Sequence, residues 1–266
     1  MKKLLIITAA TCIGAFAPRL MSQDLLSGWR TAFAPNTMEL AEVKQNDTLT
    51  TFVLRNISGK RITAFAVRLS NDTTHSVDSF EAENDFEPGT SNSLTVGKNE
   101  SSAEHLLRLS AVIFRDGTSL GESDVLDGIR GRRLGLSMEI ERVAGILSLA
   151  ANAEDESIEA LKTRIGSLPQ SSEDAVASVR GVQLPGINID RIKDAGSSFV
   201  HGFHVGVSNA REAALWKINQ VTQLPVEARG RARPSRGGAL LDLRHLYQAL
   251  SARNQAFLNQ RGVIHQ

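Results

Sequence analysis

Up to about Asp116 the chain alternates apolar and polar residues in short runs that glycine, asparagine and aspartate interrupt. Successive side chains of a β-strand point to opposite faces of a sheet, so this period of two predicts strands. About six short strands with turn residues between them favour two antiparallel sheets packed face to face. The predicted strands span residues 39–44, 48–55, 61–69, 74–80, 93–96 and 105–115.

The residues between the second and third predicted strands, Asn56 to Gly59, have the composition of a short hairpin loop. Ser58-Gly59 offers the positive-φ residue that such a loop needs. Asp116-Gly117 is a second strong turn, directly after the last predicted strand. The better core face of the strand after Gly59 consists of Thr63, Phe65, Val67 and Leu69.

These residues resemble a known class of module. An Asn-x-Ser-Gly-Lys turn followed by Ile-Thr-Ala-Phe-Ala-Val is similar to the central hairpin of immunoglobulin-like or fibronectin-III-like modules in bacterial envelope proteins. The later Ala-Val-Ile-Phe-Arg-Asp-Gly-Thr resembles the closing strand and turn of such a module. The resemblance covers about residues 36–120 and implies adhesion, scaffolding or ligand presentation. The chain departs from true immunoglobulin domains because it lacks the cysteine pair and because Trp29 lies upstream of the predicted strands.

After Gly121 the apolar residues recur at helical spacing, from Val125 and Ile129 to Leu147. Ser123-Asp124 predicts the start of this helix, and Gly131 to Gly135 predict a break in it. Further helices are predicted from about Asn152 to Ile165, over 171–180, over 190–223 and over 239–259. The fold class is therefore α+β, with an N-terminal antiparallel immunoglobulin-like β-sandwich followed by an all-α region of helical hairpins.

The last predicted helix carries an apolar seam at three-four spacing, which is typical of helices that pack on a partner helix. The seam contains one polar position, Asn254. It predicts self-association through residues 239–260. The seam residues are Leu240, Leu243, Tyr247, Leu250, Asn254 and Phe257.

The N-terminus has the three parts of a secretory leader. Met1-Lys2-Lys3 is basic, an uncharged apolar run follows, and Ala15-Phe16-Ala17 has the small-x-small form of a cleavage site. We expect cleavage between Ala17 and Gln23 and a secreted or periplasmic mature chain. No later run is long enough to cross a bilayer. The predicted parts are a leader (1–23), the sandwich (24–120), a helical region (121–227), a basic linker (228–238) and a C-terminal amphipathic helix (239–266).

Cys12 is the only cysteine and lies within the predicted leader. The mature chain then has no disulfide, thiolate nucleophile or cysteine-ligated metal. A lipid anchor on Cys12 is disfavoured because Ala9-Ala10-Thr11 lack the large aliphatic residue that precedes a lipidated cysteine.

Charge is unevenly distributed, although the whole chain has a net charge of only +1. The segment from Ala228 to Gln266 contains seven arginines, no lysine and one acid, Asp242. Two interpretations stay open: a solvated flexible linker, or electrostatic docking on lipid headgroups, wall polymer or an acidic partner. Nucleic acid is not expected, because the chain carries a leader and no aromatic residue interleaves with the arginines. The anion-docking candidates are Arg229, Arg231, Arg233 and Arg236.

Catalytic and metal-binding motifs are weak. His201 and His204 share a helix face, but no glutamate lies between them and a third ligand is missing. Asp116-Gly117-Thr118, with Glu122 and Asp124, is explained by a hairpin turn and a helix cap rather than by a calcium loop. No Gly-x-Ser-x-Gly elbow is present, and no cofactor is expected.

The sequence therefore favours an exported periplasmic or envelope-associated binding or scaffold protein, whose partner is a protein or an anionic envelope component. The alternative is a hydrolase of envelope polymer whose carboxylates come together only in the folded chain. A third interpretation is that the helices cover the sandwich and the chain is one domain.

Overall fold

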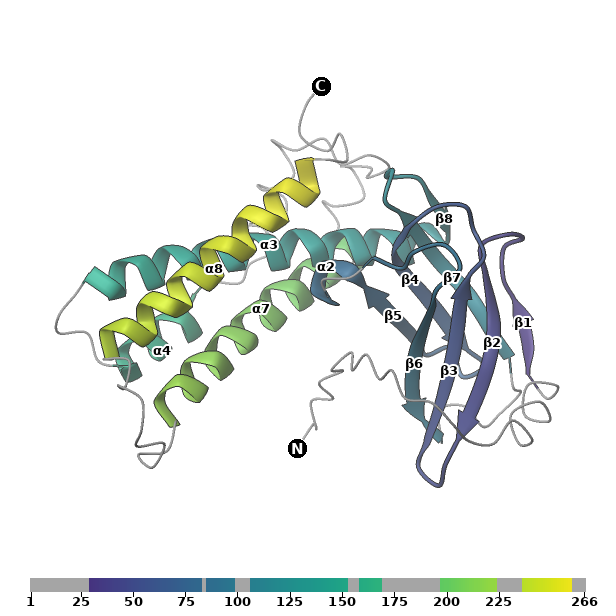
Figure 1. Cartoon of the computed structure of the whole chain (residues 1–266), viewed down its shortest axis with the longest axis horizontal. Helices are drawn as coiled ribbons and strands as arrows, with labels where there is room; N and C mark the ends of the chain where they lie inside the picture. The colour runs from purple at the N-terminus through teal and green to yellow at the C-terminus, as the bar shows by residue number, and fades with distance from the viewer. Residues whose placement is uncertain are drawn as a thin grey trace. The chain divides into compact units, whose positions relative to one another are not determined.

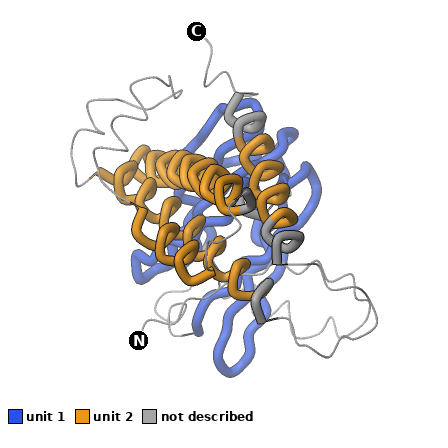
Figure 2. The backbone as a smooth tube through the Cα atoms, turned by 90° about the vertical axis from the view of Figure 1, so that its left-hand side faces the viewer, with its two compact units in different colours: residues 1–121 blue, residues 122–266 orange. Residues whose placement is uncertain are grey.

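The computed structural model describes residues 29–82, 85–98, 106–152, 158–168, 197–223 and 236–259. They form two compact units, which divide in the sequence between Gly121 and Glu122 (Figure 2). We refer to them as the β unit and the helical unit. All eight described strands lie in the first and the four long described helices in the second, which confirms the α+β class. The predicted leader (1–23) and the predicted helix over 171–180 lie outside the described residues.

The β unit contains two sheets (Figure 1). Every strand pair is antiparallel except β1 with β7, which is parallel. One sheet has the order β2-β3-β6, formed by β2 (Met38–Gln45), β3 (Leu49–Asn56) and β6 (Ser91–Gly97). The other has the order β1-β7-β4-β5, with β8 paired to β7, and consists of β1 (Arg30–Ala32), β7 (Leu106–Phe114), β4 (Ile62–Leu69), β5 (Thr74–Asp78) and β8 (Ser119–Gly121). A short helix, α2 (Ser79–Ala82), follows β5.

The core of the β unit is one hydrophobic cluster with side chains from both sheets. Trp29 belongs to it, with 7% of its surface exposed, and its ring contacts Phe52 edge-on at 4.6 Å between centroids. Trp29 directly precedes β1, so the core does contain a tryptophan, which the strand pattern did not predict. The reason is that a strand of three residues is too short to show an alternation.

The link between β3 and β4 is not the predicted hairpin. β3 pairs with β2 and β6, whereas β4 pairs with β5 and β7, so the chain crosses from one sheet to the other at Asn56–Lys60. The positive-φ glycines are Gly89, Gly117 and Gly121, and Gly59 is not among them. Two strands of period two look the same whether they pair with each other or lie in separate sheets.

The side chain of Asn56 holds this crossing together. It is fully buried, and its Nδ2 donates to the carbonyls of Lys60 at 2.9 Å and Phe86 at 2.7 Å. Its Oδ1 accepts from the backbone N–H of Ser58 at 3.0 Å and from the Ser58 hydroxyl at 2.6 Å. Both amide hydrogens and both lone pairs are therefore used, which offsets the cost of burying the group.

The predicted core face of β4 is correct for Phe65, Val67 and Leu69 and wrong for Thr63. The register with β7 shifts between Ile62 and Ala64, so Thr63 is the extra residue of a β-bulge. Ile62 then joins the core, and the Thr63 hydroxyl donates to the carbonyl of Ile113 at 3.1 Å. A bulge reverses the alternation on one side of it, and an alternation pattern cannot indicate a bulge.

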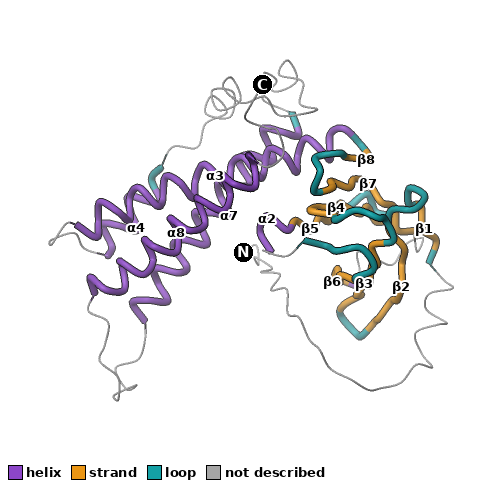
Figure 3. Tube along the Cα trace, turned by 45° about the horizontal axis from the view of Figure 1, so that its top comes forward, coloured by secondary structure: helices purple, strands orange, loops and turns teal. Residues whose placement is uncertain are grey.

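The helical unit consists of α3 (Ser123–Asn152), α4 (Ile158–Gly166), α7 (Ser198–Gln223) and α8 (Arg236–Asn259). Helices α3, α7 and α8 lie side by side (Figure 1, Figure 3). The predicted break at Gly131–Gly135 is wrong, because α3 is continuous through these residues. The inward positions predicted for α7 are buried where the structure describes them: Phe199, Phe203, Val207, Ala210, Ala214 and Ile218.

Glycines bring the backbones of α3 and α7 into contact. A Cβ atom added at Gly131 would lie 2.1 Å from the carbonyl oxygen of Phe199, and one added at Gly202 would lie 2.0 Å from that of Gly128. Gly135 and Gly206 are equally close to the facing backbone. Residues further along α3 contact residues further along α7. The two helices therefore run parallel and do not form a hairpin. The glycines that weaken an isolated helix here permit its closest packing contact.

Candidate functional site

His201 and His204 lie on α7. His201 is exposed, and His204 is half-buried, with its ring 5.9 Å from that of Phe203. Over the described residues no group of three or more histidines, cysteines, aspartates or glutamates comes together, so no third ligand joins this pair there. The intervening residues have packing roles: Gly202 contacts α3, and Phe203 lies in a hydrophobic cluster with Leu134.

The predicted anion-docking arginines lie between α7 and the first residue of α8. Arg229, Arg231 and Arg233 lie outside the described residues, and Arg236 is the first residue of α8. Their sequence position is nevertheless informative, because the basic segment joins the end of α7 to the start of α8.

Asp116-Gly117-Thr118 forms the turn between β7 and β8, as predicted. Gly117 has a φ of 85°, and the Asp116 carboxylate accepts from the Thr118 backbone N–H at 3.0 Å. Lys60 Nζ donates to the same carboxylate at 2.7 Å. The hydrogen bond from Lys60, followed by those from Thr118, lowers the pKa of Asp116 from 3.8 to about 2. The acid stabilises a turn and the neighbouring sheet crossing.

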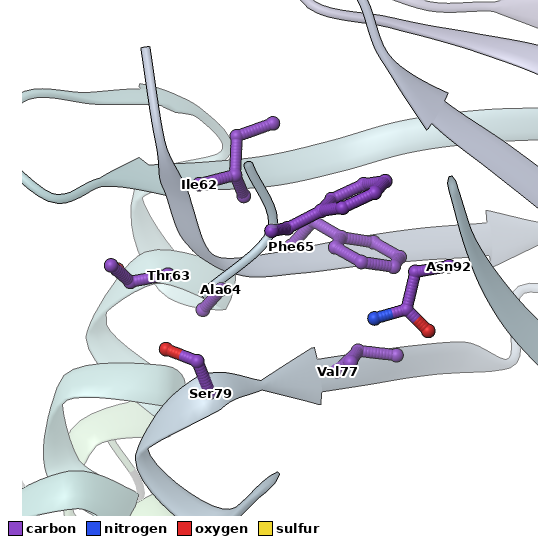
Figure 4. Close-up of a pocket in the computed structure, with 8 residues that line it drawn as sticks. Ile62, Thr63, Ala64, Phe65, Val77, Ser79 and Asn92 are labelled. Atoms are coloured by element: carbon purple, nitrogen blue, oxygen red, sulfur yellow. The ribbon is translucent and has the colours of Figure 1, made fainter. Parts of the chain in front are cut away.

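A small cavity in the β unit lies between β4, β5 and β6 (Figure 4). Its volume is about 10 Å³, room for about one water molecule. Phe65 and Phe86 form one wall, with ring centroids 5.7 Å apart. Two of the polar side chains at the cavity have partners, since Thr63 bonds to Ile113 and Ser79 donates to Asp85 at 3.1 Å. This cavity is a packing defect and has no room for a substrate.

A buried ion pair joins α3 to α7. Glu139 has no exposed surface, and its Oε1 accepts from Arg211 Nε at 2.8 Å, while Arg142 lies 3.6 Å from its Oε2. Glu139 Oε2 and Arg211 Nη2 are buried without a hydrogen-bond partner. Because each charge compensates the other only when Glu139 and Arg211 lie side by side, the pair favours one register of α3 against α7. Sequence reasoning missed Glu139, although its place in the apolar stripe between Leu136 and Val143 was a signal.

The predicted seam of α8 is occupied within the chain. Leu243, Tyr247 and Asn254 are buried, α8 packs mainly on α3, and Lys217 Nζ lies 5.6 Å from the ring centre of Tyr247. Burial raises the pKa of the Tyr247 hydroxyl. These three predicted seam positions are therefore buried against the chain itself, and Leu250 is half-buried. Self-association through this face would require α8 to separate from α3.

Three of the four exposed large apolar residues of the described helical unit adjoin, in the sequence, residues that meet at one level of that unit. Trp216 is 55% exposed and Leu149 is 67% exposed, and the other two in the described part of this unit, Leu241 and Leu246, are on α8; the β unit has three more, Leu49, Ile57 and Leu120. A hydrogen bond from Gln248 to Ser148, at 3.4 Å, and the contact of Lys217 with Tyr247 bring the three helices together at this level. Leu149, Trp216 and Leu246 each adjoin one of these contact residues in the sequence. We use the name apolar belt for Leu149, Trp216, Leu241 and Leu246.

The belt lies near the end of the helical unit where α7 ends and α8 begins. The chain from Arg229 to Arg244, which starts in the connection between them, contains five arginines and one acid, Asp242. None of the helices in the described part of the chain is long and apolar enough to cross a bilayer.

Comparison of the chain with protein-family models, curated proteins and solved structures finds no match.

Proposed function

We propose that this chain is an exported binding or scaffold protein of the bacterial envelope, in which the helical unit carries the partner-binding surface. The apolar belt is the observation that carries the proposal. Exposed tryptophan and leucine side chains that gather near one end of a unit are typical of interaction surfaces. The leader-like residues 1–23 support export.

We further propose that the β unit is an immunoglobulin-like sandwich. Its strand order supports this assignment, because β2-β3-β6 and β4-β7-β8 correspond to strands A-B-E and C-F-G of that architecture, with β5 added beside β4. Trp29 is buried in the core, but it precedes β1 and does not lie on β4, so it is not the strand-C tryptophan of that architecture. On this proposal the β unit is a rigid, exported scaffold.

The charged residues with the best-defined contacts support binding rather than catalysis. Asp116 stabilises a turn, and Glu139 is neutralised between two arginines inside the helical unit. Neither carboxylate lies in an open cleft with a free second acid, which polymer hydrolysis would need.

Co-sedimentation of the mature chain with bacterial envelope fragments tests the binding function. We expect the chain to pellet with the fragments and Trp216→Ala to lower the bound fraction. Leu120→Ala is the matched control, because Leu120 is an equally exposed apolar residue in the β unit. A chain that stays in the supernatant, or a control variant that loses as much binding, would contradict the proposal.

Export is tested separately by fractionating cells that express the full chain. We expect a shortened protein outside the cytoplasm, with a new N-terminus between Ala17 and Gln23. An intact chain in the cytoplasm would contradict the export half of the proposal and leave the binding surface untouched.

A further inference from the structure

We infer that the outer edge of β6 pairs with β6 of a second copy of the chain, so that two three-stranded sheets join into one continuous sheet. The two strands run antiparallel about a two-fold axis at Leu94. This contact lies in the β unit and goes beyond the proposed function, which assigns partner binding to the helical unit.

One edge of β6 faces away from its sheet. β6 ends the order β2-β3-β6, and within the described residues it pairs with β3 alone. At the two ends of this ladder the Asn56 N–H donates to the Thr90 carbonyl at 3.0 Å, and the Lys98 N–H donates to the Thr48 carbonyl at 2.9 Å. Antiparallel ladders exchange hydrogen bonds at every second residue, so the backbone groups of the even-numbered residues of β6 face β3. The N–H and C=O groups that point away from β3 belong to Ser91, Ser93, Thr95 and Gly97.

β6 differs from the other sheet edges in features that oppose strand pairing. It has no charge and no proline over its seven residues, and its register with β3 is unbroken. β2 carries Glu39, Glu42 and Lys44, and its register shifts between Leu40 and Glu42. β5 has five residues and ends in Asp78, and β1 and β8 have three residues each. Charges, bulges and short strands are the means by which sheet edges avoid pairing, so among the described edges β6 is the one suited to a further strand.

The residues of β6 favour a copy of the same strand as the occupant. About a two-fold axis at Leu94, Ser93 faces Thr95 of the second copy, so each outward N–H and C=O meets an outward group. A charged strand would bring like charges together across such an axis, whereas β6 has no charge to repel its copy. The Thr95 hydroxyl already bonds to that of Thr51 at 2.9 Å, and a hydroxyl contact of the same kind fits between Ser93 and the second copy's Thr95.

The core holds β6 in place for this contact. Leu94 and Val96 are buried in the core cluster of the β unit. Asn92 turns toward Val77 of β5 at the small cavity, and Ser93 is exposed on the opposite face of the strand (Figure 4). Because the strand is already ordered, pairing through its backbone costs little further conformational entropy.

Sedimentation of the mature chain over a range of concentrations tests the inference. We expect a monomer–dimer equilibrium that salt leaves unchanged, because the contact contains no charge. Ser93→Pro removes an N–H that points away from β3, and it should weaken dimerisation by at least about tenfold, since each copy loses a hydrogen bond. Ser93→Val keeps this N–H and is the matched control, which should dimerise as the unaltered chain does.

Two further variants separate this contact from misfolding and from the apolar belt. Trp29 fluorescence in a Trp216→Phe chain should give both Ser93 variants the unfolding midpoint of the unaltered monomer, because Trp29 lies in the same core cluster as Leu94. Trp216→Ala should leave the dimer intact, since the belt belongs to the helical unit.

Disulfide cross-linking reports the register and does not depend on the proline variant. Cys12 lies in the predicted leader, so a cysteine introduced into the mature chain has no competitor. In the two-fold register, Ser93 and the second copy's Thr95 have Cα atoms about 5.5 Å apart, a span that a disulfide bridges. Two Ser93 residues are diagonal neighbours about 7–8 Å apart, as are two Thr95 residues. A mixture of Ser93→Cys and Thr95→Cys chains should therefore cross-link on oxidation much more than either chain alone.

Each remaining outcome decides against the inference. A monomer at every concentration would overturn it. A dimer that Ser93→Pro leaves unchanged, or that Trp216→Ala abolishes, would place the contact on another surface. Cross-linking of the mixture that is no stronger than that of each chain alone would overturn the register at Leu94. A monomeric chain that loses binding to envelope fragments through Ser93→Pro would assign the β6 edge to a strand of another protein.

Discussion

The β unit and the helical unit solve the same packing problem in different ways. In the β unit, large side chains from two sheets fill one core, and the buried polar side chain of Asn56 has all of its hydrogen-bonding groups paired. In the helical unit, α3 and α7 meet backbone to backbone at glycines, and the buried ion pair of Glu139 with Arg211 leaves polar atoms unpaired. The difference teaches that glycines on a helix can be packing residues. It also teaches that the buried ion pair contributes more to the alignment of α3 with α7 than to the stability of the unit.

The largest expected effect is the loss of the buried charge. Glu139→Leu should lower the free energy of unfolding of the helical unit by about 3–5 kcal/mol, because Arg211 is left buried without its partner. The double variant Glu139→Leu/Arg211→Leu should recover much of the loss. Urea unfolding followed by Trp216 fluorescence in a Trp29→Phe chain measures both. A double variant as unstable as the single one would show that the pair supplies net stability.

The glycine contact should be next in size. Gly131→Ala puts a Cβ atom 2.1 Å from the Phe199 carbonyl oxygen, so α3 and α7 must separate. We expect a loss of about 2 kcal/mol or more, despite the better helix propensity of alanine. Gly145→Ala on the same helix has no atom within 4 Å of the added Cβ and should stabilise the unit by about 1 kcal/mol. Similar values for the two variants would refute backbone contact as the basis of this packing.

The polar network of the β unit gives the third effect. Asn56→Ala removes all four side-chain hydrogen bonds at the sheet crossing and should cost about 2 kcal/mol, although the Phe86 carbonyl keeps its bond from the Ile62 N–H and the Ser58 hydroxyl keeps its bond to the Lys60 carbonyl. Trp29 fluorescence in a Trp216→Phe chain reports the change. Asn46→Ala is the control, since Asn46 is exposed and bonds only within its own turn, and it should cost about 0.5 kcal/mol. Equal losses would mean that the sheet crossing does not depend on Asn56.

The smallest expected effect is on the stability of the β unit at low pH, through Asp116. The pKa of Asp116 is lower in the folded chain, about 2, than its ordinary value of 3.8. Its contribution to stability is therefore complete above pH 3.8 and is lost as pH falls toward 2. Asp116→Asn should flatten the stability of the β unit over that range, by less than about 1 kcal/mol because the pair is exposed. An unchanged acid profile would show that Lys60 and Asp116 interact too weakly to matter.

Much of the β unit was predictable from the sequence, because its strands are defined by alternation. The predicted 39–44, 48–55 and 61–69 correspond to β2, β3 and β4 within one residue at each end. The three-residue strands β1 and β8 were too short to predict. The sheet crossing at Asn56 was not predictable either, since alternation does not say which strands pair.

In the helical unit the inward faces of α7 and α8 were predictable, but the contacts were not. Gly131 looks like a helix breaker until its neighbour Phe199 is known, because close approach is a property of two segments. The sequence indicated the belt only in part: Trp216 does not lie on the helix face that carries the apolar residues Ala214 and Ile218. What joins Trp216 to Leu149 and Leu246 is the arrangement of three helices.

The most direct test of the account uses the two tryptophans, one in each unit. Emission spectra of Trp29→Phe and Trp216→Phe chains would be recorded as bacterial envelope membranes are added. The account predicts a blue shift for the chain that keeps Trp216, because its indole leaves water, and no shift for the chain that keeps the already buried Trp29. Bound protein whose Trp216 emission does not change would contradict the claim that the belt is the binding surface.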